Sequence, residues 1–474
     1  MGKFDKSSSV IAKKLAGIGE LIQAKRFGEA WSQLEKLPST FGVETASEEA
    51  AYFHYLKGYV FWELGDKKGG IAATQKALEM YLVLRDLDGI AKSQKLAGAL
   101  LIDLGNLTLA KEHLELAVST FKPSKQWGQA ARALNQMAYL SKIRGELRYA
   151  NDYNAEAQRC ASLAKDKYYE TVLRGSLSWH QFLEGDWKAA KASLKEFLLE
   201  TNRTNDWGNY ALGLVNFGRS ELLGGRFKEA RKHYLEASQV CSQENLIGTL
   251  KIVDEHLAEL SIAEGRFSEA EDYLKKALEI GERVSPYGTI MTQCWRLMGD
   301  LYNAKGEPSE ALKAYETCES YLIKLPEELE RGACFVGRGV AYANLKNWKD
   351  AKNAFDRAFE VFENCENDWE LSKAVVTAVE CGAYASKQME TELLMGCEFF
   401  QKYEHPAWDK RARKLLGSLE SAHDRLPLDA KKGNLEKQEI ITALQETGNN
   451  VTLAAKKLGL LRSTLHYKIK RYKI

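Results

Sequence analysis

A glycine recurs along this chain at an almost constant interval. Seven positions carry it, each followed by Asp, Asn, Glu or Arg: Gly65, Gly105, Gly145, Gly185, Gly225, Gly265 and Gly306. The interval is 40 residues five times and then 41, and the register extends to Lys25 and Lys346 before it fades near Ser386. A fixed period of this length is typical of a repeat array, in which 474 residues need no single large core.

Further columns of residues keep the same register. Alanine stands five residues after most of these glycines, and a small residue stands seven before each: Gly58, Gly98, Ala138, Ser178, Gly218, Ala258 and Gly299. Small residues let two helices approach closely, and the apolar spacing between the columns is helical. Five prolines fall at predicted turns: Pro38, Pro123, Pro286, Pro308 and Pro326. Without a competing strand signal, the sequence predicts an all-α fold.

This pattern resembles the tetratricopeptide repeat family, in which each unit is a helix, a tight turn and an antiparallel helix. The resemblance covers about residues 10 to 405, and the solenoid that it implies spans 1–405 in about nine to ten two-helix units. The unit exceeds the family's usual length of about 34 residues, so each helix should be nearly a turn longer. The family implies a helical solenoid whose concave surface is lined by first helices and serves binding.

The early first helices carry an aromatic and basic strip that could bind a partner. The predicted partner-binding groove comprises Tyr52, Tyr55, Tyr59, Trp62, Lys92, Lys95, Arg132, Asn135 and Tyr139. Such a strip suits an acidic, partly apolar peptide or helix of a partner protein. The alternative is that these residues only pack the terminal units and bind no ligand.

Positive charge is concentrated at the C-terminal end. Residues 431–474 contain ten basic and three acidic residues, a net charge of +7, within a chain whose total is +2. The other 430 residues therefore carry −5. From Asn450 onward there are seven basic residues and no acidic one, which suits contact with nucleic-acid phosphates.

Three short helices are predicted in this segment. Leu435, Ile440, Ile441 and Leu444 define the first, which Thr447, Gly448 and Asn449 end. Asn450 and Thr452 can start the second, with Ala454, Ala455 and Leu458 inward, and Gly459 permits a left-handed turn. The third runs from about Arg462 to Tyr472 with Leu465 and Ile469 inward. This order is what a major-groove reader requires.

The segment resembles the Fis-type helix-turn-helix found at the C-terminus of bacterial enhancer-binding activators. The matching positions are Thr447, Gly448, Asn450, Ala454, Ala455, Leu458, Gly459, Leu460, Arg462, Thr464, Leu465 and Lys468. Asn449 replaces a glycine of the family pattern, and Leu461 replaces the serine that would cap the recognition helix. A missing cap costs about 0.5–2 kcal/mol of local stability. The alternative to a DNA-binding module is a small capping domain with a solvated basic face.

The resemblance implies binding to double-stranded DNA. The predicted DNA contacts are Asn450, Thr452, Lys456, Lys457, Arg462, Ser463, Thr464, His466, Tyr467, Lys468, Lys470 and Arg471. One short recognition helix reads few base pairs, so we expect a homodimer on two half-sites. The stripe from Leu435 to Leu444 is the expected dimer contact, because so small a module should not bury it internally.

Enzymatic chemistry, cofactors and membranes find no support in the sequence. It contains no phosphate-binding loop, nucleophile elbow or metal-binding spacing among its eight histidines, so we expect no enzyme, no cofactor and no metal. The activators named above normally carry a central ATPase, and here the array takes its place. No apolar run is long enough to span a membrane, and the N-terminus lacks a signal peptide, which predicts a cytoplasmic protein. The eight cysteines are expected to be reduced and packed.

The sequence thus predicts three parts: an array over 1–405, a connecting helix and linker over 406–430, and a helix-turn-helix over 431–474. Its predicted function is a bacterial DNA-binding transcriptional regulator whose array senses or binds a partner. The alternative is an interaction scaffold or co-regulator with weak or no DNA binding.

Overall fold

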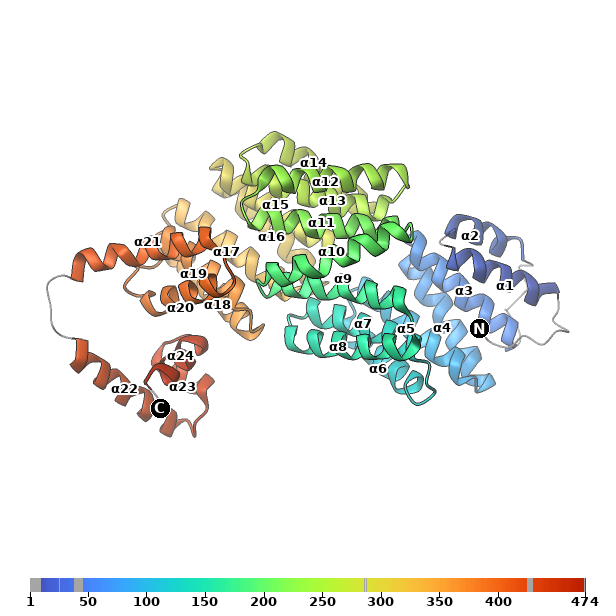
Figure 1. Cartoon of the computed structure of the whole chain (residues 1–474), viewed down its shortest axis with the longest axis horizontal. Coiled ribbons are helices and arrows are strands. Elements are labelled where there is room, and N and C mark those ends of the chain that lie inside the picture. The colour runs from blue at the N-terminus through green and yellow to red at the C-terminus, as the bar shows by residue number, and fades with distance from the viewer. Residues whose placement is uncertain are drawn as a thin grey trace. The chain divides into compact units, whose positions relative to one another are not determined.

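The computed structural model describes residues 10–24, 26–37, 46–284, 286, 288–423, 429–472 and 474, with the backbone alone at 284, 418–423 and 429–435. Every regular element in these residues is an α-helix (Figure 1). In chain order these are α1 (Val10–Gln23), α2 (Phe27–Glu35), α3 (Glu48–Leu64), α4 (Lys67–Leu84), α5 (Leu87–Asp103), α6 (Leu107–Phe121), α7 (Trp127–Ile143), α8 (Leu147–Ala164), α9 (Lys167–Leu183), α10 (Trp187–Arg203), α11 (Trp207–Leu223), α12 (Phe227–Gln243), α13 (Ile247–Ala263), α14 (Phe267–Val284), α15 (Thr289–Lys305), α16 (Pro308–Leu322), α17 (Glu328–Asn344), α18 (Trp348–Asn364), α19 (Asp368–Glu380), α20 (Glu390–Lys402), α21 (Pro406–His423), α22 (Asp429–Glu446), α23 (Val451–Leu458) and α24 (Arg462–Tyr472). The prediction of an all-α helical solenoid followed by a helix-turn-helix is confirmed.

These helices belong to two compact units. Unit 1 comprises Met1–Lys142, Arg148–Ser176 and Leu278–Met291. Unit 2 comprises Ile143–Leu147, Leu177–Ala277 and Thr292–Ile474, and therefore contains both the last repeats and the C-terminal helices. The boundaries that we expected near 405 and 430 stay a prediction.

The recurring glycines end the first helix of each repeat. All seven have a positive φ, between 71° and 94°, a region that glycine enters without the strain a Cβ would bring. The polar residue that follows often caps the next helix: Asp66 accepts a hydrogen bond from the backbone N–H of Gly69, and Asp186 accepts one from that of Ala189. Lys346 occupies the same column with a φ of 59°, whereas Lys25 lies outside the described residues.

A second column of turns was not predicted. Between one repeat and the next, non-glycine residues adopt φ values of 54° to 58° at intervals of 40 residues: Arg85, Lys125, Lys165, Asn205 and Asn245. Because no glycine marks these positions, the sequence pattern revealed only one of the two turns in each repeat.

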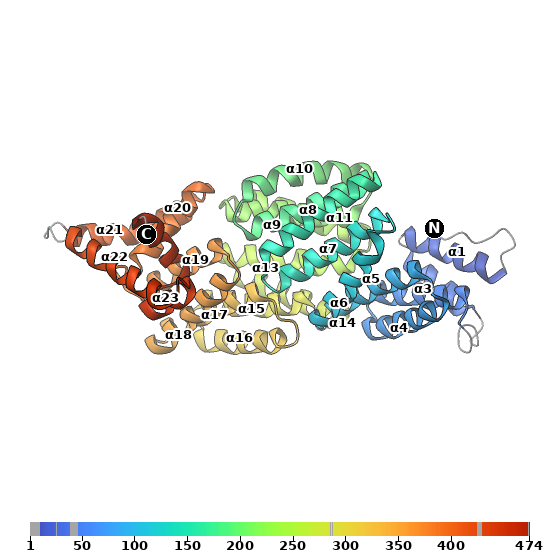
Figure 2. The same ribbon diagram turned by 90° about the horizontal axis from the view of Figure 1, so that it is seen from below.

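The column of small residues lies where paired helices cross. A Cβ placed on Gly218 in α11 would stand 2.5 Å from the ring of Tyr234 in α12. Tyr234 is fully buried, so a larger residue at 218 would push the pair apart. Figures 1 and 2 show another such pair, α3 and α4, packed side by side in unit 1.

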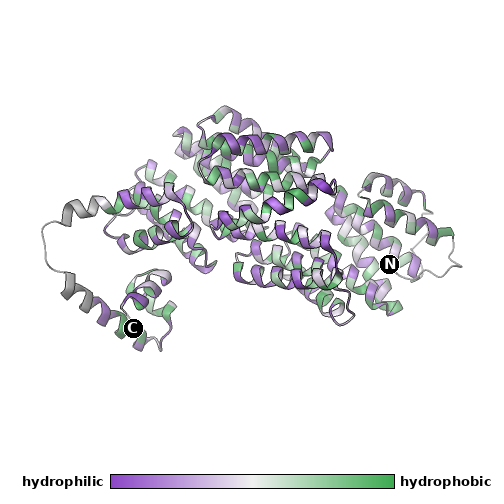
Figure 3. Ribbon diagram, viewed as in Figure 1, coloured by the Kyte–Doolittle hydropathy of each residue, from purple (hydrophilic) through white to green (hydrophobic). Residues whose placement is uncertain are grey.

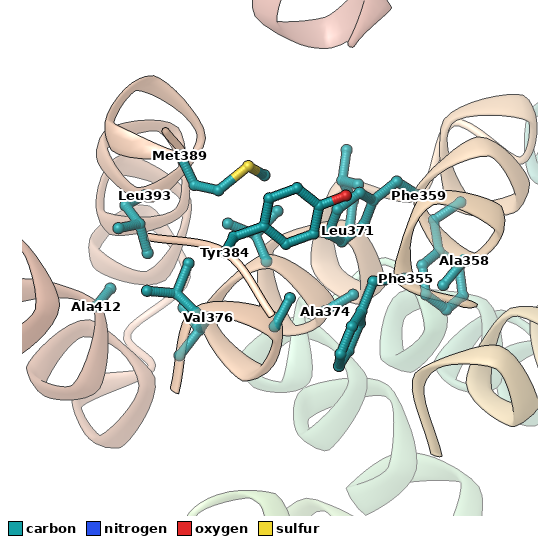
Figure 4. Packing of buried hydrophobic residues seen from close by; sticks show 14 of the residues in the cluster. Phe355, Ala358, Phe359, Leu371, Ala374, Val376, Tyr384, Met389, Leu393 and Ala412 are labelled. Atoms are coloured by element: carbon teal, nitrogen blue, oxygen red, sulfur yellow. The ribbon is translucent and has the colours of Figure 1, made fainter. Parts of the chain in front are cut away.

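Most helices are amphipathic and pack against the next helix along the chain. The mixed hydrophilic and hydrophobic colouring of single helices follows this pattern (Figure 3). In unit 2 a large core joins α17 to α21. There Tyr384, from the segment where the repeat fades, lies between Phe359 of α18 and Met389, the residue before α20 (Figure 4). Its hydroxyl donates to Asp356, which ties that segment to α18.

Three hydrogen bonds in unit 2 join repeats that are far apart in the sequence. The indole Nε1 of Trp187 donates to the backbone oxygen of Tyr403 at 2.8 Å, and His405 Nε2 lies 2.7 Å from the backbone oxygen of Gly185. Asn367 donates to the backbone oxygen of Leu183 at 2.9 Å. In a simple solenoid each repeat contacts only its neighbours. This array is also held by contacts between distant repeats.

Candidate nucleic-acid interface and partner groove

The last three helices, α22, α23 and α24, form a small module with a core of its own. Six buried residues make this core: Ile440, Ala443, Leu444, Ala454, Ala455 and Leu465. The alanine pair and Leu465 face inward as expected, and Ile469 packs partly against them. The module therefore carries the packing of a folded helix-turn-helix.

Burial in this module corrects the reasoning about a dimer contact. Ile440 and Leu444 are 1% and 8% exposed because α23 and α24 cover them, so the module does bury part of the stripe that we expected to remain uncovered. Ile441 is half-buried, and the side chain of Leu435 lies outside the described residues. The apolar stripe alone therefore gives no argument for a dimer.

The turns of the module follow the predicted chemistry. Asn450 caps α23 by accepting a hydrogen bond from the backbone N–H of Leu453 at 3.1 Å. Gly459 ends the helix with a φ of 65°. Asn449, where the Fis-type pattern has glycine, adopts a φ of 62°, which asparagine tolerates better than most residues. The substitution therefore preserves the turn.

The recognition helix α24 exposes one stripe of cationic and imidazole side chains. Arg462, His466 and Lys470 are exposed at intervals of four residues, with Arg471 beside them. Side chains four residues apart lie on the same face of a helix. This face can donate hydrogen bonds to phosphates and to guanine edges.

The predicted contacts on and before α23 are also exposed. Thr452, Lys456 and Lys457 are open to solvent, and so is Asn450, whose side chain is used in the cap. Lys457 pairs with Glu446 of α22. Positive charge thus extends from α24 onto the end of α23.

Thr464 and Lys468, by contrast, are buried, which the sequence reasoning did not anticipate. Thr464 is 0% and Lys468 9% exposed. Lys468 Nζ lies 2.7 Å from Glu436 Oε1 of α22, and the Tyr472 hydroxyl donates to the same carboxylate. Burial raises the pKa of Glu436, but hydrogen bonds from Lys468 and Tyr472 outweigh it and lower that pKa. Lys468 therefore joins α22 to α24 in this structure.

The flank of α24 formed by Ser463, Thr464 and Tyr467 faces the array. Their polar atoms donate hydrogen bonds to glutamates of α18 and α20. Three predicted DNA contacts are thus engaged within the chain.

In unit 1 the predicted groove residues lie on α3, α5 and α7, and part of the strip lines an open pocket of about 640 Å³. Lys92 and Arg132 line this pocket, but each is partly neutralised. Lys92 Nζ lies 2.5 Å from Asp88, and Arg132 lies 3.1 Å from Asp166. The Arg132 guanidinium also sits 4.4 Å from the centre of the Tyr169 ring. The pocket thus offers ordered cationic groups.

Lys95 is not a lining residue of the pocket, but it bonds one and is repelled by both of these cations. Its Nζ donates to Gln129 Oε1 at 2.7 Å, an amide oxygen that carries no charge. Burial, with repulsion from Arg132 and Lys92, lowers the pKa of Lys95 to about 7. An acidic group bound nearby would favour the charged ammonium.

The aromatic part of the strip also serves packing. Tyr52 stacks on Tyr55 with ring centres 6.2 Å apart, and a Cβ on Gly19 of α1 would stand 2.8 Å from the Tyr52 hydroxyl. Trp62 Nε1 donates to Asp103 of α5 at 2.7 Å. Tyr59 and Asn135 are half-buried, and Tyr139 is exposed. Tyr52 and Trp62 therefore fit the alternative that the strip only packs the terminal units. The cationic residues of the pocket fit that alternative less well.

Sequence reasoning missed several pocket residues. Lys125, Trp127 and Gln129 line the pocket from the turn before α7 and from its first residues. A tryptophan also begins α11, two repeats later, so an aromatic at the helix start was the available signal. The glutamates that meet α24 had no comparable signal.

Other expected properties can be compared with the described residues. Seven of the eight cysteines are buried, Cys381 is half-buried, and all are free, as expected. Within the described ranges, no cluster of three His, Cys, Asp or Glu side chains could hold a metal ion. In the same part of the chain, no helix combines the length and apolar character needed to cross a membrane.

Two family models match parts of the chain. Residues 433–472 match the model described as bacterial regulatory protein, Fis family, and residues 251–322 match a tetratricopeptide repeat model. The chain thus contains a Fis-type helix-turn-helix and tetratricopeptide repeats. Neither the Fis-type DNA-binding family nor the tetratricopeptide repeat family is an enzyme family. The search of curated proteins found no match.

Solved structures resemble the array. The Rap protein complexed with competence and sporulation factor aligns with a TM-score of 0.58 at 14% identity, over 75% of this chain and 98% of its own. Aspartyl phosphate phosphatase F from Bacillus subtilis aligns at 0.46, with 13% identity and coverages of 76% and 95%. The apo form of the quorum sensor NprR from B. thuringiensis aligns with a TM-score of 0.41 at 16% identity, over 75% of this chain and 98% of its own. At 14% identity, the first of these shows a common helical-repeat fold.

Proposed function

We propose that this chain is a DNA-binding transcriptional regulator of a bacterial cytoplasm that works without an ATPase, a cofactor or catalysis of its own. Its C-terminal module docks in the major groove of double-stranded DNA, and its array binds a protein or peptide partner. The exposed stripe of Arg462, His466 and Lys470, presented by a Fis-type module with a net charge of +7 over 431–474, carries this proposal.

The two ends of the stripe should have different roles. Arg462 stands at the first residue of α24, the end that enters the major groove in helix-turn-helix complexes. A guanidinium there can donate two hydrogen bonds to a guanine edge. Lys470 stands two turns further along, where an ammonium suits a phosphate.

The proposed complex contains two copies of the chain. A helix of eleven residues is about 16 Å long and reads only a few base pairs. Useful specificity then needs two half-sites about one helical turn apart. Light scattering of the full chain with a palindromic DNA site should give a mass of two chains per duplex, and a strictly monomeric complex would contradict the dimer.

The proposed partner of the array is an acidic, partly apolar segment that binds beside Lys92, Lys95 and Arg132. Two of these cations already face a carboxylate, so Lys95 is the group that gains most from an acidic ligand. Trp127, the first residue of α7, lines the same pocket and offers apolar surface, and Tyr55 lies on the neighbouring α3.

The proposed function is tested by a gel shift of the full chain with genomic DNA fragments at two salt concentrations. We expect a subset of fragments to be retained at the higher salt, because base contacts survive where phosphate contacts weaken. If no genomic fragment binds better than random DNA at either salt concentration, the proposal of a DNA-binding regulator is replaced by that of an interaction scaffold or co-regulator.

A further inference from the structure

Three glutamates of the array meet one flank of the recognition helix. Glu363 lies on α18, and Glu392 and Glu398 lie on α20, which packs against α24 (Figure 1). Thr464 Oγ1 donates to Glu392 Oε1 at 2.7 Å, and the Tyr467 hydroxyl lies 3.3 Å from Glu398 Oε1. Ser463 Oγ donates to Glu363 Oε1 at 2.7 Å.

Glu363 also takes the place of the missing helix cap. The backbone N–H of Ser463, at the second position of α24, donates to Glu363 Oε1 at 2.9 Å. A helix normally receives this bond from its own capping side chain, and Leu461 has none to give. Leu461 instead packs against the apolar core of α17–α21. Leu461, one of the two departures from the Fis-type pattern, therefore helps to attach the module to the array.

This contact occupies part of the helix surface that a major-groove complex would need. A recognition helix reads bases and phosphates with the residues of its first turns. Here the hydroxyls of Ser463 and Thr464 and one N–H of that turn are already bonded, and Thr464 is fully buried. Three carboxylates beside the helix would also repel DNA phosphates.

We infer that the surface formed by Glu363, Glu392 and Glu398 binds the recognition helix of the same chain in competition with DNA. DNA then binds only the fraction of molecules in which α24 has left the array, which reduces the apparent affinity by that fraction. This inference rests on the proposed DNA-binding function, whose atoms it concerns.

The test compares three full-length proteins: the parent, the double variant Glu363→Ala with Glu392→Ala, and the control double variant Glu229→Ala with Glu316→Ala. Glu229 and Glu316 are exposed on α12 and α16 of the same unit, so the control removes the same charge. DNA affinity is measured by fluorescence anisotropy on a fragment retained by the parent, or on random duplex DNA if none is retained. Hydrogen exchange of the peptide that covers 461–467 is measured without DNA.

Release of the helix should tighten DNA binding by about tenfold in the Glu363/Glu392 variant and leave the control near the parent. Exchange at 461–467 should accelerate in that variant alone. Equal affinities for all three proteins would overturn the inference and leave DNA binding standing. Weaker binding by a folded Glu363/Glu392 variant would overturn it too, because the array would then support the recognition helix as a cap. If the helix is released but none of the proteins binds DNA, the proposed function itself fails.

Discussion

Lowering the pH should loosen the long-range contact around His405. The imidazole is 3% exposed and stacks between Trp187 and Trp369, with ring centres 4.9 and 4.2 Å away. Its Nε2 bonds the backbone oxygen of Gly185, and its buried Nδ1 meets no partner among the described residues. A second proton would therefore add a buried, unpaired N–H and a buried charge.

The size of the effect follows from the pKa. Burial lowers the pKa of His405 from 6.5 to about 4, although the bond to Gly185 opposes the shift. The opened state binds the proton more readily, so this contribution to stability is complete well above pH 6.5 and is lost as the pH falls toward 4. Between pH 7 and pH 5 the loss amounts to about 2 kcal/mol.

Hydrogen exchange measured on peptides covering 183–188 and 400–409 reports the free energy of local opening, after correction for the intrinsic pH dependence of exchange. The parent should lose about 2 kcal/mol of opening free energy between pH 7 and pH 5. His405→Gln can keep a hydrogen bond to Gly185 without titrating, so it should lose much less. An equal loss in both proteins would refute the assignment to His405.

Two further predictions concern the proposed interfaces. Arg462→Ala should cost about 1–3 kcal/mol of binding free energy on a preferred DNA site and have little effect on random DNA. Lys470→Ala should weaken binding to preferred and random DNA alike and reduce the slope of log affinity against log salt concentration by about one. Anisotropy titrations that show equal losses on specific and random DNA for both changes would contradict these roles. Lys95→Met should abolish recovery of an acidic partner from cell extract, whereas the control Lys76→Met, at an exposed position of α4, should not. The affinity of the parent protein for that partner should rise as the pH falls through about 7, where Lys95 gains its proton. Recovery of the same partners by both lysine variants would remove the pocket from the account.

Much of the fold was predictable because its constraints are local. A glycine with positive φ and a capping residue after it depend only on the backbone of one turn, so Gly65 and Asp66 leave a readable pattern. The turns at Arg85 and Asn205 use the same conformation without glycine and leave none. The contact between Gly185 and His405 joins residues 220 apart and depends on the summed rotation of the intervening repeats, which no local pattern encodes.

The candidate DNA interface was predictable to a similar extent. Helical periodicity separates the exposed Arg462 and Lys470 from the buried Leu465, and the structure agrees. Burial of Thr464 depends on Glu392, 72 residues earlier, and the pairing of Lys468 depends on Glu436. Long polar side chains can serve either DNA or a neighbouring helix, so sequence alone could not choose between these uses.

The central claim is that residues 431–474 give this chain its affinity for DNA. The most direct measurement compares the dissociation constants of the full chain and of a truncation to residues 1–430 for the same duplex, with circular dichroism to follow the helices of the array. The six buried residues of the module's core all lie on α22–α24, so the truncated array should keep the helical signal of its own helices. We predict that the truncation loses DNA binding. A folded truncation that keeps the full affinity would contradict the account.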